Sequence, residues 1–90
     1  MGQLGALERV IVFIIALSQR NARAGNDPLS LRLPMTRADI ADLLGMTIET
    51  ASRCFTKLRQ RQLIEISQNS NIKIKDLNGL KALASSGYEH

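Results

Sequence analysis

Between residues 47 and 60, hydrogen-bonding side chains recur at the spacing of one face of a helix. At about 100° per residue, that face carries Glu49, Ser52, Arg53, Thr56 and Gln60, with Lys57 beside it. Arginine can bond guanine bidentately, glutamate can accept from cytosine, and serine or threonine can bond bases or phosphates. These side chains could therefore read base pairs in duplex DNA. An ordinary solvent-exposed helix face has a similar composition, so both interpretations remain open on chemistry alone.

The overall composition excludes most other chemistry. The 90 residues carry a formal net charge of +4, with one cysteine, Cys54, and one histidine, His90. This supply excludes an internal disulfide and a Cys/His metal cluster, and no nucleophile–base pair is evident. We therefore expect a protein that is not an enzyme and that has no cofactor in this chain. The isoelectric point of about 9.8 favours a polyanionic partner.

The most apolar stretch of the chain is Val10–Leu17. A bilayer span needs about 20 such residues, so we expect no membrane partner. A secretory signal peptide would need a positively charged segment before the apolar run, whereas Glu8 offsets Arg9 here. The stretch is more typical of a buried helix in a reducing, cytoplasmic protein.

Helix signals predict a single domain over residues 1–90, beginning with a long helix from Leu4 to Arg23. This helix ends where glycine, asparagine and proline follow one another, at Gly25–Pro28. Its apolar residues form two rows: Leu4, Leu7, Ile11 and Ile14 in one, and Val10, Phe13 and Leu17 in the other. Because one row suffices to cover a small core, we expect the first row to be exposed.

Capping signals predict two short helices in the middle of the chain. Thr36, with Asp39 three residues later, is typical of an N-cap, and Thr47 is a second N-cap. The first helix ends at Gly45 and the second at about Arg61. The residues expected on their buried faces are Ile40, Leu43 and Leu44 in the first, and Ile48, Ala51, Phe55 and Leu58 in the second.

Strand signals flank these helices. Alternating apolar residues predict a strand over Leu29–Leu33, and two more over Leu63–Ile66 and Asn71–Lys75. The last two would form a hairpin with a turn at residues 68–70, before a final helix, Leu77–Ala84, capped by Asp76. Two helices joined at a glycine and followed by a hairpin predict a winged helix-turn-helix, mainly α with a small β-hairpin wing.

A longer pattern, M-T-R-x-D-I-A-x-x-L-G-M-T-x-E-T-x-S-R, runs from Met35 to Arg53. It resembles the DNA-binding domain of the Crp/Fnr family of bacterial transcription regulators, and the similarity extends over nearly the whole chain. The resemblance implies sequence-specific binding to duplex DNA, with the helix at about 47–61 in the major groove. Family members also have an N-terminal β-barrel and a long dimerisation helix. This chain therefore looks like the C-terminal module, without the sensor domain and the dimerisation helix.

The E-x-x-S-R pattern at Glu49, Ser52 and Arg53 resembles the Fnr/FixK branch and implies a TTGAT-type half-site. By this analogy Arg53 reads guanine, Glu49 its paired cytosine and Ser52 a thymine, while Ile48 touches a thymine methyl group. The residues expected at phosphates are Thr36, Arg37, Thr47, Thr50, Thr56 and Lys57.

The resemblance also implies partners. Double-stranded DNA is the first, bound by a homodimer of the full-length protein. RNA polymerase is the second, because the loop at Gly25–Pro28 corresponds to one that touches it in activators of the family, although most such loops only connect. A winged helix that contacts other proteins without binding DNA is the alternative.

Five other side chains allow two interpretations each. Cys54 is favoured as an inert buried thiol over a redox-sensitive one. Asp39 and Asp42 are favoured as a helix cap and a solvated carboxylate over an acid–base pair. Lys73 and Lys75 are equally consistent with phosphate contacts and with a solvated strand face.

Overall fold

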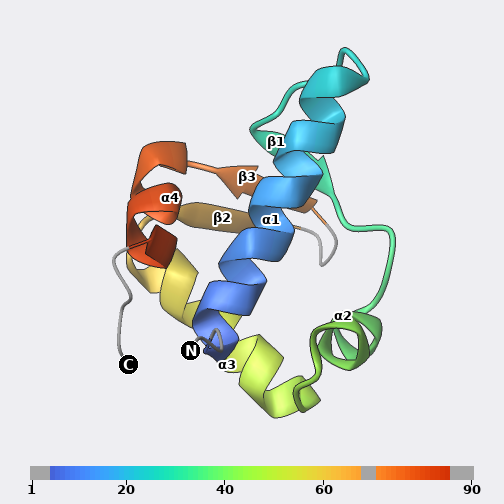
Figure 1. Cartoon of the computed structure of the whole chain (residues 1–90), viewed down its shortest axis with the longest axis vertical. Helices are drawn as coiled ribbons and strands as arrows, with labels where there is room; N and C mark the ends of the chain where they lie inside the picture. Colours follow the sequence, from blue (N-terminus) through green and yellow to red (C-terminus); the bar gives the residue numbers. More distant parts are fainter. Residues whose placement is uncertain (1–4, 68–70, 86–90) are drawn as a thin grey trace.

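The computed structural model describes residues 5–67 and 71–85, which form four helices and a three-stranded sheet (Figure 1). The elements are α1 (Ala6–Arg23), β1 (Ser30–Arg32), α2 (Arg37–Leu44), α3 (Ile48–Gln60), β2 (Ile64–Ser67), β3 (Asn71–Ile74) and α4 (Leu77–Ser85). Each expected helix and strand is confirmed within two residues of its expected bounds. The expected start at Leu4 and the hairpin turn at residues 68–70 lie outside the described residues.

The sheet has the strand order β1-β3-β2, and both pairings are antiparallel. Leu31 of β1 and Ile66 of β2 both lie opposite Ile72 of β3, and this row faces the core. Ser30, Lys73 and Glu65 form the next row on the outer face, where all three are exposed. The predicted hairpin wing is therefore extended by a third strand from before the helix-turn-helix.

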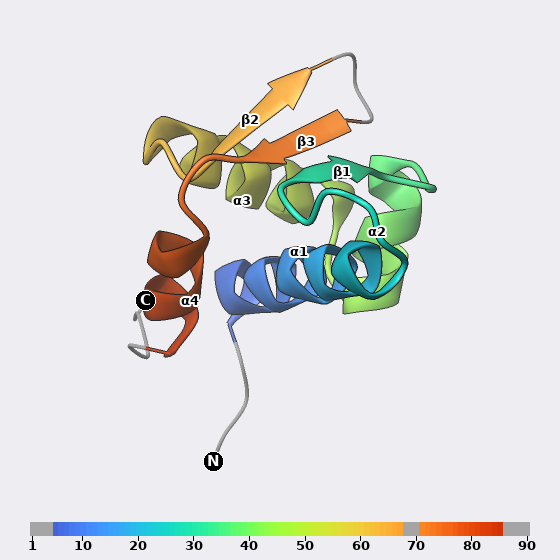
Figure 2. The same ribbon diagram turned by 90° about the horizontal axis from the view of Figure 1, so that it is seen from above.

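The core lies between the sheet and α1, with α3 packed against both (Figure 2). α4 lies beside the first turns of α1 and closes one end of the core. The buried apolar cluster is Val10, Ile11, Ile14, Leu31, Leu33, Ile40, Cys54, Phe55, Leu58, Leu63, Ile64, Ile72, Ile74 and Leu80. All four helices and all three strands contribute side chains to this cluster or pack against it. The helix-turn-helix is therefore held in place by the rest of the described chain.

The expectation that one apolar row of α1 is exposed is wrong. Ile11 and Ile14 are completely buried, and Leu7 is half-buried. The reason is that α1 is contacted by α3, β1 and α4 together, so the core surrounds more of the helix than one row can cover. The large apolar side chain of α1 that is exposed is Val12, at 47%.

Two residues expected in the core are instead exposed, Leu43 at 61% and Ile48 at 45%. The buried side of α2 is centred between Ile40, Ala41 and Leu44, and Leu43 projects roughly 110° from that centre. Ile48 is the first residue of α3, beyond the part of the helix that the core covers. Both residues lie close in sequence to the turn between α2 and α3.

Candidate nucleic-acid interface

The start of α2 is closed by a reciprocal pair of hydrogen bonds. The backbone N–H of Asp39 donates to Thr36 Oγ1 (3.1 Å), and the N–H of Thr36 donates to Asp39 Oδ2 (3.3 Å). This capping box satisfies two amides that would otherwise lack partners. The interpretation of Asp39 as a cap is thus confirmed.

The turn between α2 and α3 is built on Gly45, which has a φ of 73° in the left-handed region. The N–H of Met46 donates to Ala41 O (2.9 Å), and the N–H of Gly45 donates to Asp42 O (3.3 Å). These two bonds form the motif with which helices commonly end at a glycine. A side chain at position 45 would be strained in this conformation, so the sharp turn that separates the two helices depends on this glycine.

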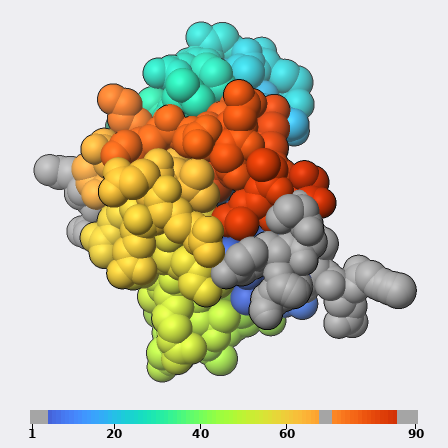
Figure 3. Space-filling model, turned by 90° about the vertical axis from the view of Figure 1, so that its left-hand side faces the viewer, coloured from blue at the N-terminus to red at the C-terminus, as the bar shows by residue number. Residues whose placement is uncertain are grey.

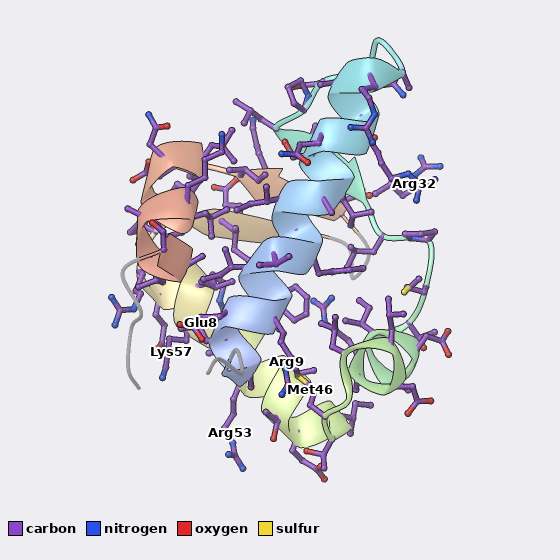
Figure 4. All side chains as sticks on the ribbon, viewed as in Figure 1. Glu8, Arg9, Arg32, Met46, Arg53 and Lys57 are labelled. Atoms are coloured by element: carbon purple, nitrogen blue, oxygen red, sulfur yellow. The ribbon has the colours of Figure 1, made fainter. Side chains whose placement is uncertain are left out.

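The turn is also held from α1, by a residue that the sequence analysis did not single out. Arg9 Nη1 donates to Leu44 O at 3.1 Å and, more weakly, to Gly45 O at 3.5 Å. Figure 4 shows Arg9 reaching from α1 toward the turn, next to Met46. Because an arginine between apolar positions of a helix is usually solvated, no local pattern in the sequence indicates this contact.

The first turn of α3 is fixed by two threonines. The N–H of Thr50 donates to Thr47 Oγ1 (3.1 Å), which confirms Thr47 as the N-cap, and Thr47 Oγ1 donates to Thr50 Oγ1 (3.0 Å). The Thr47 hydroxyl hydrogen is therefore engaged within the protein. The Thr50 hydroxyl accepts that bond and retains its own hydrogen to donate elsewhere.

The outward face of α3 carries the residues that the sequence predicted for it. Glu49, Ser52, Arg53 and Lys57 are exposed, and Thr56 is half-buried, whereas Ala51, Phe55 and Leu58 face the core. Figure 4 shows Arg53 projecting away from the body of the molecule. The polar and apolar sides of α3 are thus segregated, and most of the hydrogen-bonding side chains of the helix face solvent.

A cleft of about 240 Å³ separates the start of α1 from one side of α3. It is lined by Ala6, Leu7, Thr50, Arg53, Cys54 and Lys57. Burial raises the pKa of the Cys54 thiol, although the cations of Lys57 and Arg53 oppose the shift. The thiol is therefore protonated at neutral pH, and at 7% exposure it acts as the buried filler that the sequence favoured.

Arg37 does not extend freely into solvent. Its guanidinium lies over the ring of Phe55, 4.2 Å from the centroid, and this burial lowers the pKa of Arg37. Arginine nevertheless keeps its charge in proteins. The contact joins the first residue of α2 to the buried side of α3, and the edge of the guanidinium keeps N–H groups that the ring does not use.

A second basic surface lies where the end of α1 meets the sheet. A groove of about 630 Å³ there is lined by Asn21 and Asn26 together with Arg32, Asn71 and Lys73 of the strands. Figure 4 shows Arg32 at the upper right side of the molecule and Arg53 at its lower end, far apart from one another. In Figure 3, likewise, the end of α1 and the loop after it project at one end, and the start of α3 forms the other. The Lys75 ammonium donates to Gln62 Oε1 (2.7 Å), so this lysine is held by the protein.

The described residues show little that would support another kind of site. In residues 5–67 and 71–85, no three histidine, cysteine or acidic residues are grouped so that they could hold a metal ion. No helix within the same ranges is long and apolar enough to cross a membrane.

A helix-turn-helix with an exposed polar face on its second helix, followed by a β-hairpin wing, defines the winged helix-turn-helix class of DNA-binding domains. Within that class, the chain belongs to the Crp-like helix-turn-helix domain family, whose model matches residues 8–83. It is therefore a DNA-binding domain of transcription regulation.

The relatives that it resembles are regulators of this family. The chain is 42% identical over 83 residues to the nitrogen fixation regulation protein FixK of Rhizobium meliloti, covering 92% of the chain and 37% of that protein. It is 42% identical over 84 residues to the transcriptional activatory protein AadR of Rhodopseudomonas palustris, with 93% and 35% covered. The solved structure of FixK2 from Bradyrhizobium japonicum superposes with a TM-score of 0.79 at 34% identity, covering 91% of this chain and 39% of that one. The chain thus spans little more than a third of the length of these relatives.

Proposed function

We propose that the domain binds duplex DNA sequence-specifically, with α3 in the major groove of a TTGAT-like half-site. The observation that carries this proposal is the outward face of α3, where Glu49, Ser52 and Arg53 are exposed together on a helix whose other side is buried. The major groove is wide enough to admit an α-helix and presents a distinct pattern of donors and acceptors for each base pair.

Each base-reading side chain has a chemical counterpart in the half-site. Arg53 has the fork geometry for the O6 and N7 atoms of guanine, Glu49 accepts from the N4 amine of the paired cytosine, and Ser52 bonds a thymine. Ile48, exposed at the start of α3, supplies an apolar contact for a thymine methyl group. The half-site itself rests on the resemblance of these residues to the Fnr/FixK branch.

The phosphate contacts surround this face. Thr50 offers its free hydroxyl hydrogen, and Lys57 and the edge of Arg37 offer positive charge. The remaining contacts are Thr36 and Thr47, at the starts of α2 and α3, and Thr56. The starts of helices attract phosphates, because their amides and dipole are positive there.

Fluorescence anisotropy on two labelled duplexes, one with a TTGAT half-site and one scrambled, tests the division between base and phosphate contacts. Arg53→Ala should weaken binding to the half-site by about 1–3 kcal/mol and change the scrambled duplex little. Thr50→Ala should weaken both equally. Arg20→Ala, which removes a cation from the far end of α1, is the matched control. Equal losses on both duplexes for Arg53→Ala would reduce that residue to a phosphate contact.

The alternative, a winged helix that contacts only proteins, makes a different prediction in the same assay. Each phosphate that the domain neutralises should contribute a slope of about −0.9 to log affinity against log salt. A folded domain without measurable DNA binding at low salt would favour the alternative.

For the protein in which this domain functions, we also propose a cytoplasmic location, a homodimeric state and RNA polymerase as a second partner. The loop at Gly25–Asp27 is exposed, and Asn26 and Arg32 both line the basic groove at that end of the molecule. In transcription assays with the full-length protein, Asn26→Ala and Arg32→Ala should lower transcript yield without changing DNA affinity. If both variants gave the wild-type transcript yield, the proposal that this surface contacts RNA polymerase would be wrong.

A further inference from the structure

The end of α2 leaves backbone carbonyls that the turn itself does not satisfy. Helices end with carbonyls that have no partner within the helix, and here the amides of Gly45 and Met46 satisfy Asp42 O and Ala41 O. Leu44 O and Gly45 O accept instead from Arg9 Nη1, which belongs to α1. Two carbonyls of the turn between α2 and α3 are therefore held from another helix.

Charge supports this contact. Arg9 places a cation at the carboxyl end of α2, where the helix dipole is negative. Its side chain is half-buried, and the hydrogen bond to Leu44 O, at 3.1 Å, has a charged donor, which makes it stronger than a bond between neutral groups. The Arg9 guanidinium also lies 3.9 Å from where a Cβ on Gly45 would stand.

The start of α3 depends on such a contact more than the rest of the helix does. Phe55 and Leu58 are buried in the core, but Ile48 and Glu49 extend beyond it and are exposed. Apolar packing is not directional, so it restrains the middle of α3 better than the angle at which its first turn leaves Gly45. The hydrogen bonds from Arg9 act directly on that turn.

We propose that Arg9 is a positioning residue for base recognition. It holds the α2–α3 turn against α1, sets the angle at which the first turn of α3 enters the groove, and does not itself touch DNA. The proposal rests on the sequence-specific DNA binding proposed above. It predicts that Arg9 controls discrimination between sequences, whereas a phosphate contact would control affinity for all sequences alike.

The test compares Arg9→Met and Arg9→Lys with Arg20→Met, which removes the same charge from the same helix far from the turn. Methionine keeps the aliphatic stem of Arg9 but has no donor, and lysine keeps a charged donor that can reach Leu44 O. Binding to the TTGAT and scrambled duplexes is measured by anisotropy, well below the midpoint of thermal unfolding of each variant.

Relative to Arg20→Met, Arg9→Met should bind the TTGAT duplex about three- to tenfold more weakly and the scrambled duplex equally well. Arg9→Lys should recover part of the lost discrimination. Equal losses on both duplexes, or no difference from Arg20→Met, would overturn the proposal.

A second measurement needs no DNA. In Arg9→Met, the amide of Met46 should exchange its hydrogen several-fold faster than in the wild type, because the turn that protects it is looser. In Arg20→Met it should exchange at the wild-type rate. If the wild type does not distinguish the two duplexes, the proposed function fails. The exchange rate then still decides whether Arg9 holds the turn, and an unchanged rate in Arg9→Met would show that it does not.

Discussion

Two arginines near α3 have the same side chain and different surroundings. Arg53 is exposed on the outward face, where its planar fork is free for a base. Arg37 lies over Phe55 at 4.2 Å, a geometry that contributes about 0.5–2 kcal/mol depending on how far water is excluded. Arg37 therefore joins α2 to α3 before any ligand is bound, and only its edge remains for a phosphate.

Cys54 gives a prediction at the same scale. Because burial raises the pKa of its thiol, the folded domain favours the protonated form. The resulting stability is fully present below the pKa of an unfolded cysteine, about 8.5, and is lost as pH rises through the higher pKa of the folded state. We expect the free energy of unfolding to fall between these two values in the wild type, and this contribution to be absent in Cys54→Ala.

Alkylation measures the same property directly. At pH 7.5 iodoacetamide should modify Cys54 at least about tenfold more slowly in the folded domain than in the urea-unfolded chain, because the thiol is buried and protonated. Mass spectrometry gives both rates. Equal rates would mean that the thiol is accessible in the folded domain. The interpretation of Cys54 as a redox-sensitive thiol would then be favoured over that of an inert one.

At the scale of the element, α4 has a constraint at its third residue. The N–H of Gly79 donates to Asp76 Oδ1 (2.9 Å), which confirms Asp76 as the cap of this helix. A Cβ on Gly79 would lie 2.5 Å from Asp76 Oδ2 and 2.7 Å from Leu63 Cδ2. Gly79→Ala should therefore destabilise the domain by about 1–3 kcal/mol, despite the better helix propensity of alanine.

Thermal unfolding measures this change, and Asn78→Ala is the control. Asn78 is exposed on the same helix, so its replacement should leave stability unchanged or raise it slightly. A Gly79→Ala variant as stable as Asn78→Ala would show that Asp76 and Leu63 can move aside without cost.

The elements were predictable because their signals are local. Caps at Thr36, Thr47 and Asp76, and the glycine at position 45, mark helix ends in any context. The exposure of Leu43 and the burial of Ile11 were not predictable in this way, since both depend on which elements pack against a helix and how far they surround it. The period of apolar residues indicates which face of a helix is buried. How wide that buried face is depends on the elements that pack against the helix.

Some residues of the candidate site were likewise predictable from local sequence signals, and others depend on tertiary contacts. Glu49, Ser52 and Arg53 follow from the helical period, because all three lie on the side opposite the core. Arg9 could not be found from the sequence, since its contact with Leu44 O joins two helices that are far apart in the chain. The stacking of Arg37 on Phe55 was also missed, because it depends on how α2 packs against α3.

At the scale of the whole molecule, the described residues contain one helix-turn-helix, in which α3 is the helix proposed to read bases. Dimeric helix-turn-helix proteins place two such helices about 34 Å apart in successive major grooves, and linking them raises avidity by about 10²–10⁴. Since Ile11 and Ile14 are buried, the apolar row of α1 that contains them is not available for self-association. We expect these 90 residues to be monomeric and to bind a palindromic duplex with little gain over a half-site.

Titration of both duplexes, with sedimentation of the domain alone, checks this expectation. A gain of a hundredfold or more on the palindrome, or a dimer in sedimentation, would show that these residues already contain a competent dimer interface. The control is a duplex that carries two half-sites at the wrong spacing. The domain should bind it with the same affinity as it binds a single half-site.

The strand order β1-β3-β2 has a consequence for how the domain is made. Leu31 of β1 and Ile66 of β2 both pair with Ile72 of β3. During synthesis, β1 and β2 therefore have no strand to pair with until β3 has left the ribosome. Contacts between distant parts of a chain form slowly, and unpaired strand edges invite association with other chains. We therefore expect the nascent domain to complete its sheet only after β3 has been synthesised, and a chain interrupted before Ile72 to be more susceptible to proteases.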